Sequence, residues 1–331
     1  MKLERIAVIG AGGWGTALSL IWAKRGHRVL LWGNNSPRVE AIRKTRENKI
    51  HLPGATLPDS IGLTSELKDC GDADLIVFVT PSTALREIAG RLRLTNKHAV
   101  ILSCVKGLEH GTGKRMSEIL TETFPDHAVA VLSGPNLAIE VAKELPTATV
   151  IACTDRARAT ELQDYLGTSR FRIYTGEELV GIELGGALKN IFAIAAGAGD
   201  GLGLGDNAKS ALVTRSLAEM IRLGTQMGAQ AQTFFGLSGA GDLVATCFSQ
   251  LSRNRRVGEQ LGRGRTLEEI TSSMQTVPEG IPTAKSAYEC ARKLNVNTPV
   301  IDEVYALVHQ SKPPVRAMED LLARDQKAER G

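Results

Sequence analysis

One lysine lies where burial would change its chemistry. Lys189 falls in the segment 179–197, which is apolar on nearly every side and so predicts a buried helix. Burial disfavours the charged amine and can lower a lysine pKa by up to about 3 to 5 units, which brings proton transfer near neutral pH within reach. The small residues Gly185, Gly186 and Ala193 lie one turn away on the same face and leave room for another group. The alternative is a lysine whose amine extends into water.

Two other segments offer polar groups that could complete a site with Lys189. Lys106 follows a predicted strand at 98–103, on the edge where open parallel sheets bind ligands; otherwise it is an ordinary surface lysine. The sequence GLSGAGDL at 236–243 supplies backbone amides and the carboxylate of Asp242. This carboxylate could pair with Lys189, hold a substrate hydroxyl, or cap a helix.

A basic triplet predicts an anion site. The residues SRN at 252–254 are followed by two more arginines and by a predicted helix at 256–262. Guanidinium groups, side-chain amides and helix N-termini are common phosphate ligands. The composition therefore favours a phosphate dianion, with a solvated basic loop as the alternative.

The segment GAGGWG at 10–15 predicts a dinucleotide site, because it follows a strand at 5–9 and opens a helix that reaches about Gly26. In a GxGxxG motif the first glycine permits the tight turn, the second lets the backbone approach a pyrophosphate, and the third lets the helix pack closely on the strand. No carboxylate follows the second strand at 28–32, so NAD and NADP both stay open. Arg38 could meet a 2′-phosphate or could simply be solvated.

The first half of the chain alternates short apolar runs with helical patterns, as parallel βαβ units do. Ser36 and Thr80, each followed by proline, predict N-caps of helices. The predicted strands are 5–9, 28–32, 74–79, 98–103 and 128–132, with edge strands at 147–152 and 171–174. Their nearly unbroken apolar character is typical of strands that are covered on both faces.

Beyond about residue 178 the strand signals fade and helical patterns replace them. The predicted helices are 178–197, 206–227, 256–262, 283–294 and 300–309, and a capping box at Thr266 opens another short one. We therefore expect an α/β fold with a Rossmann-type doubly wound parallel sheet at 1–178. An all-α C-terminal domain at 179–331 should follow it.

Composition limits the class of protein. With 43% hydrophobic and 23% charged residues, the 331-residue chain resembles a globular protein large enough for two domains. The net charge of +4 suits small anions, and no basic stripe points to nucleic acid. Five scattered cysteines without a CxxC pair predict neither a metal site nor disulfides, which fits a reducing compartment. Glycines interrupt the uncharged stretch 6–23, so we expect neither export nor membrane insertion.

Taken together, these motifs closely resemble the bacterial-type NAD(P)-dependent glycerol-3-phosphate dehydrogenases over essentially the whole chain. The motifs occur in family order and are GAGGWGTAL, CVKGLE, SGPN, ELGGALKN, LSGAGDL, SRN and VPEG. The resemblance implies hydride transfer between NAD(P)H and C2 of dihydroxyacetone phosphate, which gives sn-glycerol 3-phosphate, a phospholipid precursor. It also implies a cytoplasmic enzyme with a small phosphorylated substrate, and it suggests a homodimer.

The resemblance further implies roles for individual residues. Lys189 would exchange a proton with the substrate C2 oxygen, and Lys106 would touch both substrate and nicotinamide. The implied substrate ligands are Lys106, Gly134, Asn136, Lys189, Asp242, Ser252, Arg253 and Asn254. Together with the glycine motif (Gly10, Gly12, Gly13 and Gly15), the cofactor neighbours are Trp14, Asn34, Lys106, Ala138, Arg253, Val277 and Glu279. No metal is implied. Relatives often carry serine at the place of Gly13 and His or Arg at Asn34, so the cofactor preference stays open.

Two other functions stay open from the residues alone. A dehydrogenase of the same architecture could act on a 3-hydroxy acid. A substrate without phosphate, however, would give Arg253 no dianion to bind. A dinucleotide-sensing protein without turnover is the second alternative, and it would have no use for Lys189 in a buried helix.

Overall fold

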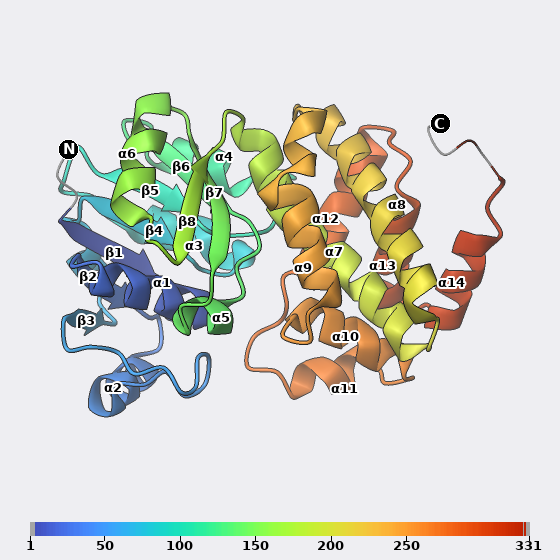
Figure 1. Cartoon of the computed structure of the whole chain (residues 1–331), viewed down its shortest axis with the longest axis horizontal. Helices are drawn as coiled ribbons and strands as arrows, with labels where there is room; N and C mark the ends of the chain where they lie inside the picture. Colours follow the sequence, from blue (N-terminus) through green and yellow to red (C-terminus); the bar gives the residue numbers. More distant parts are fainter. Residues whose placement is uncertain (1–3, 327, 329–331) are drawn as a thin grey trace.

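The computed structural model describes residues 4–326 and 328. Figure 1 shows a half built of strands and helices beside a half built of helices alone. In the described part of the chain the last strand ends at Thr175, and the first long helix begins at Leu179. The predicted fold class is therefore confirmed. The division into 1–178 and 179–331 stays a prediction, and residues 1–3, 327 and 329–331 lie outside the described residues.

One eight-stranded sheet forms the first half, in the order β3-β2-β1-β4-β5-β6-β7-β8. The strands are β1 (Arg5–Ile9), β2 (Arg28–Trp32), β3 (Ile61–Thr64), β4 (Leu75–Phe78), β5 (Val100–Ser103), β6 (Val129–Ser133), β7 (Thr147–Cys153) and β8 (Phe171–Thr175). All neighbours are parallel except β6 and β7, which are antiparallel. The strand order reverses between β1 and β4, the place where open α/β sheets bind their ligands.

The five main predicted strands are confirmed, with ends shifted by up to two residues. β3 was not predicted, because it is only four residues long and contains Gly62. The prediction that 147–152 forms an edge strand is wrong: β7 lies between β6 and β8, and β8 is the edge.

Both predicted N-caps are wrong. The helix α2 (Ser36–Thr45) is capped one residue earlier, where the side chain of Asn35 accepts the backbone N–H of Arg38. Thr80 and Pro81 lead instead into a 3₁₀ turn at Ser82–Ala84, and helix α3 (Leu85–Arg91) begins only after it. In both cases proline fixes the local backbone angle, but the cap depends on which side chain turns back onto the helix.

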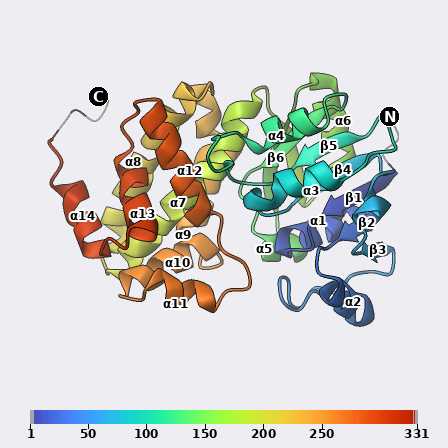
Figure 2. The ribbon, with the colours of Figure 1, turned by 180° about the vertical axis from the view of Figure 1, so that it is seen from behind.

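Helices cover both faces of the sheet. α1 (Gly13–Lys24), α5 (Ala138–Ala142) and α6 (Arg156–Leu166) lie on the face seen in Figure 1, and α3 and α4 (Met116–Thr123) lie on the face seen in Figure 2.

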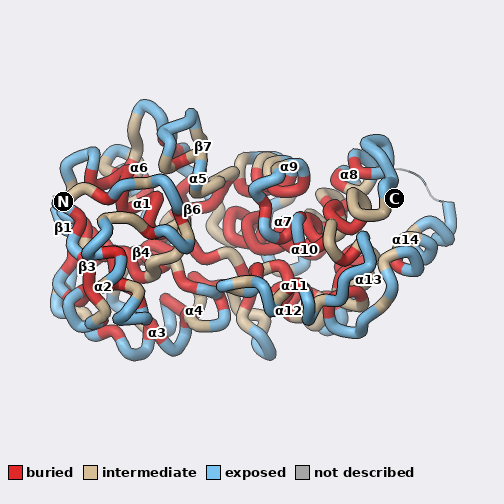
Figure 3. The backbone as a smooth tube through the Cα atoms, turned by 90° about the horizontal axis from the view of Figure 1, so that it is seen from below, coloured by how far each residue is buried: buried red, intermediate tan, exposed pale blue. Residues whose placement is uncertain are grey.

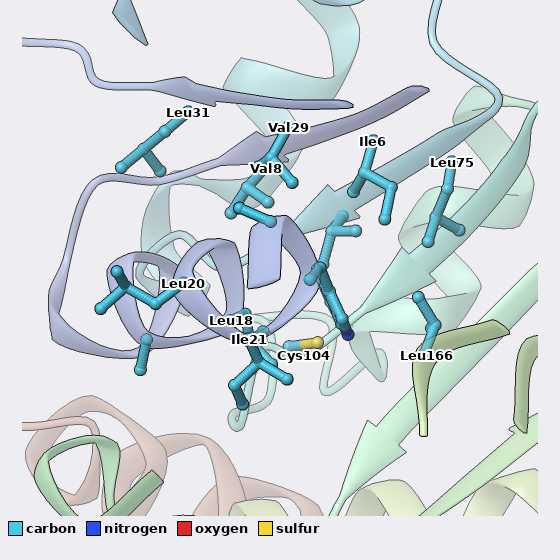
Figure 4. Packing of buried hydrophobic residues seen from close by; sticks show 14 of the residues in the cluster. Ile6, Val8, Leu18, Leu20, Ile21, Val29, Leu31, Leu75, Cys104 and Leu166 are labelled. Atoms are coloured by element: carbon cyan, nitrogen blue, oxygen red, sulfur yellow. The ribbon is translucent and has the colours of Figure 1, made fainter. Parts of the chain in front are cut away.

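Residues of β1 alternate between the two cores, as the period of a strand requires. Ile6 and Val8 pack with Leu18 of α1, as the close view in Figure 4 shows. Ala7 and Ile9 join the core under α3 and α4. The apolar runs seen in the sequence therefore reflect burial on both faces of the sheet.

The second half is built around α7 (Leu179–Gly201), which is buried along most of its length (Figure 3). The surrounding helices are α8 (Gly205–Gln226), α9 (Asp242–Phe248), α10 (Arg253–Gly262), α11 (Leu267–Ser272), α12 (Gly280–Lys293), α13 (Pro299–His309) and α14 (Pro314–Leu322). The predicted helices are present, and α9 and α14 were not predicted. By length and composition α7 could cross a membrane, but 83% of its apolar window is buried inside the fold, and core helices pass the same test.

Candidate active site

The glycine turn between β1 and α1 leaves its backbone open to a ligand. A Cβ on Gly10 would lie 2.6 Å from the carbonyl oxygen of Val79, and φ at Gly10 is +131°. A Cβ on Gly15 would lie 2.0 Å from the carbonyl oxygen of Gly10, so helix and turn meet closely. A Cβ on Gly12 would meet nothing within 4 Å, and no side chain caps α1 there. The open N-terminus of α1 fits the pyrophosphate of a dinucleotide.

Two further predicted cofactor neighbours lie at this turn. A Cβ on Gly13 would lie 3.8 Å from the Cβ of Ala138. Trp14 packs on Phe171 with ring centroids 6.2 Å apart. Its indole N–H is buried and has no hydrogen-bond partner among residues 4–326 and 328, so it can still donate to a ligand.

Asn34 and Val277 are exposed, and the described contacts do not join them to the glycine turn. Asn34 follows β2, next to the residue that caps α2. Val277 precedes α12, and 51% of its surface is accessible. Their roles at a cofactor stay predictions.

Lys106, Lys189 and Asp242 meet at the junction of the two halves. Lys106 Nζ donates to Asp242 Oδ2 at 2.6 Å, and Lys189 Nζ donates to Asp242 Oδ1 at 2.8 Å. Lys189 also donates to Thr246 Oγ1 at 2.6 Å, one helical turn after Asp242 in α9. The side chain of Asp242 is only 2% exposed. The predicted pairing of Asp242 with Lys189 is confirmed.

The electrostatics of this cluster favour proton transfer. The pKa of Lys189 is lowered to about 8, chiefly by burial and also by the charge of Lys106, while Asp242 opposes the change. Burial raises the pKa of the Asp242 carboxyl, but the two ammonium groups outweigh it and hold that pKa below its usual value. Near neutral pH the Asp242 carboxylate therefore pairs with both ammonium groups, and the cluster keeps one net positive charge that can interact with a substrate.

Small residues of α7 make the cluster possible. A Cβ on Gly185 would lie 2.6 Å from the carbonyl oxygen of Ser238, in the π-helical turn Leu237–Gly241 that leads into Asp242. A Cβ on Gly186 would lie 2.3 Å from Ser133 Oγ. The expectation that small neighbours leave room beside Lys189 is confirmed, since backbone from a distant segment occupies that room.

Gly134 and Asn136 extend the cluster along the end of β6. Lys106 Nζ donates to the carbonyl oxygen of Gly134 at 2.9 Å. The Asn136 side-chain amide donates to Thr149 Oγ1 at 3.0 Å. Asn136 Oδ1 is buried and accepts no hydrogen bond from the described residues, so it remains able to accept one from a substrate hydroxyl.

The triplet 252–254 forms the start of α10. Ser252 Oγ caps the helix by accepting the backbone N–H of Arg255 at 3.2 Å, and Arg253 is exposed beside it. Asn254 Nδ2 donates to Asn190 Oδ1 at 2.8 Å, and Asn190 Nδ2 donates to the carbonyl oxygen of Lys106 at 3.4 Å. Asn190 therefore connects the triplet to the lysine cluster.

Glu279 links the two halves beside the loop that carries Lys106, since a Cβ on Gly107 would lie 3.1 Å from its Oε2. Its carboxylate accepts the backbone N–H of Ser82 at 2.9 Å and the hydroxyl of Ser82 at 2.5 Å. Burial raises the pKa of Glu279, while Ser82 and the charge of Arg253 oppose that shift. Ser82 follows β4, beside the glycine turn, so Glu279 lies within reach of the predicted cofactor site.

The comparisons with known proteins agree with this geometry. Two family models match, the NAD-dependent glycerol-3-phosphate dehydrogenase N-terminus over residues 5–159 and the C-terminus over residues 178–319. The chain belongs to this family. A glycerol-3-phosphate dehydrogenase [NAD(P)+] from Geobacter sp. (strain M21) is 47% identical, over 98% of this chain and 99% of its own length. The resemblance predicted from the motifs is thus confirmed.

Solved structures of glycerol-3-phosphate dehydrogenases share the whole architecture. The crystal structure from Coxiella burnetii has a TM-score of 0.93 and 37% identity, and covers 97% of this chain and 99% of its own. The structure from Saccharomyces cerevisiae has a TM-score of 0.81 and 28% identity, over 98% of this chain and 100% of its own. The likeness therefore includes both the sheet and the helical half.

The structure adds residues to this glycerol-3-phosphate dehydrogenase site that sequence reasoning missed. Thr246 follows Asp242 by four residues, a helical spacing that becomes informative only once α9 is known. Asn190 lies in the motif ELGGALKN and Ser82 follows the predicted strand at 74–79, but nothing local shows what their side chains face. His51 gave no signal, yet Arg38 Nη1 lies 3.0 Å from its Nε2. Burial lowers the pKa of His51, and the nearby arginines add to the shift.

Proposed function

We propose that this chain reduces dihydroxyacetone phosphate to sn-glycerol 3-phosphate, with Lys189 as the residue that moves the proton. As a member of the NAD-dependent glycerol-3-phosphate dehydrogenase family, it is an oxidoreductase that uses NAD or NADP. The observation that carries the proposal is the buried Lys189 amine, held between Asp242 and Thr246. A bound nicotinamide supplies the hydride for the C2 carbon of the substrate.

The residues of the cluster divide the remaining work. Lys189 donates its proton to the C2 oxygen as negative charge develops there, and its pKa of about 8 suits that exchange. Lys106 adds a second positive charge toward the same oxygen. Asp242 keeps both amines in place, because each of its carboxylate oxygens accepts one of them. In the reverse direction the neutral amine of Lys189 takes the proton back.

The start of α10 is the proposed phosphate site. Arg253 is an exposed residue with a guanidinium, and the first turn adds free backbone N–H groups at the positive end of the helix. Ser252 and Asn254 already bond within the protein, so their proposed contacts would use the remaining donor and acceptor capacity of their side chains. Gly134 and Asn136 would hold the hydroxyl end of the substrate.

The proposed cofactor site extends from the glycine turn toward the lysine cluster. Gly10, Gly12, Gly13 and Gly15 would hold the pyrophosphate, and Trp14, Ala138 and Glu279 would line the rest of the nucleotide. Arg38 beside His51 could receive a 2′-phosphate, so NADP is as acceptable as NAD. We further propose a cytoplasmic location, which suits the free thiols of the five cysteines. A homodimer stays a prediction from the family.

A substrate screen tests the function. Purified protein is mixed with NADH or NADPH, and the absorbance of the reduced nicotinamide is followed with dihydroxyacetone phosphate, with dihydroxyacetone, or with a 3-oxo acid. We expect rapid oxidation of the reduced nicotinamide with dihydroxyacetone phosphate and with neither of the other two compounds. Turnover of the 3-oxo acid instead would favour the 3-hydroxy acid dehydrogenase, and cofactor binding without any turnover would favour the sensing protein; either result contradicts the proposal.

A further inference from the structure

A buried carboxylate outside the reacting cluster joins the two halves of the molecule. Glu183 of α7 is 4% exposed and accepts the backbone N–H of Ser117 at 2.8 Å and its hydroxyl at 2.6 Å. Arg115 Nη1 donates to the same carboxylate at 3.1 Å. All three donors come from the start of α4, so one carboxylate of the helical half holds one short segment of the sheet half.

The segment that Glu183 holds is the end of the loop that carries Lys106. This loop runs from β5 to α4 and is closed on itself by an antiparallel bridge between Leu108 and Arg115. The backbone N–H of Glu109 also donates to the carbonyl oxygen of Lys114 at 2.9 Å. A displacement of Arg115 is therefore passed to Leu108, two residues after Lys106.

Glu183 belongs to a stripe on one face of α7. Residues three and seven positions further along a helix share a face, and these are Gly186 and Asn190. A Cβ on Gly186 would lie 3.6 Å from Lys106 Cδ, and Asn190 donates to the carbonyl oxygen of Lys106. Glu183, Gly186 and Asn190 therefore contact the loop that carries Lys106 at three successive points along α7. Glu183 is the charged residue at one end of this stripe.

Glu183 itself does not reach the reacting atoms. It precedes Lys189 by six residues, about 9 Å along the helix axis, and points to a different side. A buried ion pair is also a costly way to fix two segments, since well-packed apolar residues often stabilise as much or more. The three hydrogen bonds that Glu183 accepts are directional, so they fix the position of the start of α4 on α7 as well as holding the two segments together.

We propose that Glu183 is a positioning residue, which clamps the start of α4 to α7 and thereby sets where Lys106 stands relative to Lys189 and Asp242. This inference rests on the proposed function, because its effect is read through the reduction of dihydroxyacetone phosphate. Loss of the clamp lets the loop shift on Gly186, and Lys106 moves away from Asp242.

The test compares Glu183→Gln with Glu219→Gln. Glu219 is a matched control: it is 1% exposed and accepts the backbone N–H groups of Val300 and Ile301 at 2.9 and 2.8 Å, where α8 meets the first turn of α13. Both variants should lose stability in chemical denaturation. Glu183→Gln should also lower kcat by about 10- to 100-fold, the cost of a small misplacement of a catalytic group. Glu219→Gln should keep its kcat.

A pH profile separates positioning from mere stability. The groups that act on the Lys189 amine are Asp242, Lys106 and the Cys247 thiol. Because Lys106 lowers the pKa of Lys189, its withdrawal in Glu183→Gln should move the alkaline limb of the reduction rate to higher pH. Should that variant be unstable, Ser117→Ala, which removes one of the three donors, should show a smaller shift in the same direction.

The outcomes are distinct. If the wild type reduces dihydroxyacetone phosphate but the Glu183 and Ser117 variants keep the kcat and pH profile of the Glu219 control, the clamp is only structural and the inference is wrong. If the wild type does not turn over this substrate, the proposed function itself fails, and the inference fails with it.

Discussion

Two ion clusters around α7 share one arrangement and differ in what they can do. In the first, Asp242 lies between Lys106 at 2.6 Å and Lys189 at 2.8 Å. In the second, near the end of α7, Asp200 lies between Lys209 at 2.8 Å and Arg255 at 2.6 Å. In both clusters one carboxylate therefore bonds two cations.

The difference lies in burial and in the number of carboxylates. Arg255 also bonds Glu259 at 3.3 Å, and Glu259 in turn bonds the exposed Arg263, so a second carboxylate lies beside the second cluster. Asp200 is 20% exposed, whereas Asp242 is 2% exposed and has no second carboxylate beside it in the described contacts. A partly hydrated cluster that holds two carboxylates stabilises packing. A buried cluster with one excess positive charge can instead stabilise an oxyanion and release a proton.

The largest expected difference between the two clusters comes from removing one lysine amine from each. Lys189→Ala should lower kcat by about 10² to 10⁴, because the general acid is lost. Lys209→Ala should keep kcat near the wild-type value and lose stability. Steady-state assays give kcat, and fluorescence titration with NADH checks that both variants still bind cofactor. Near-normal kcat in Lys189→Ala would contradict the role we propose.

The next effect comes from the carboxylates. Asp242→Asn removes the charge that raises the pKa of Lys189, so that pKa should fall below about 8 and kcat at pH 8 should drop by about 100-fold. Asp200→Asn should leave catalysis unchanged. It should cost about 3 kcal/mol in the free energy of unfolding, because it removes the carboxylate that pairs with the buried Lys209 ammonium. Equal kinetic losses in both variants would show that the two clusters do not differ in function.

The smallest effect separates two arginines of α10. Arg253→Ala should raise the KM for dihydroxyacetone phosphate by about 10- to 100-fold, the loss of a charge-assisted hydrogen bond, with little change in kcat. Arg255→Ala should change stability and leave KM alone. Kinetics over a range of substrate concentrations, with urea denaturation in parallel, measure both. A KM that rises equally in the two variants would place the phosphate elsewhere.

The sequence predicted the parts of the fold that depend on local patterns. Unbroken apolar runs identified the buried strands, and GAGGWG identified the turn, because Gly10, Gly13 and Gly15 leave no space for a Cβ and Gly12 leaves the backbone open to a ligand. β3 is too short to stand out in the sequence, and the place of β7 between β6 and β8 depends on strand pairing, which a local pattern does not contain.

The same distinction applies to the site. Lys189 and Asp242 were found because a charge in an apolar helix and an acid after glycines are unusual in sequence. Thr246 and Asn190 carry no such mark. Glu183 is also a charge in the apolar helix, but its role arises, like theirs, from the tertiary contacts of α7 with α9, α10 and the loop that carries Lys106.

The central claim is that one amine gives the proton in reduction and takes it in oxidation. The most direct test measures kcat/KM against pH in both directions. With the pKa of Lys189 at about 8, reduction of dihydroxyacetone phosphate should fall as the pH rises through 8, and oxidation of sn-glycerol 3-phosphate should rise through the same pH. The account would be contradicted if kcat/KM changed in the same direction with pH for reduction and for oxidation. It would also be contradicted if Lys189→Ala kept the pH profiles of the wild type.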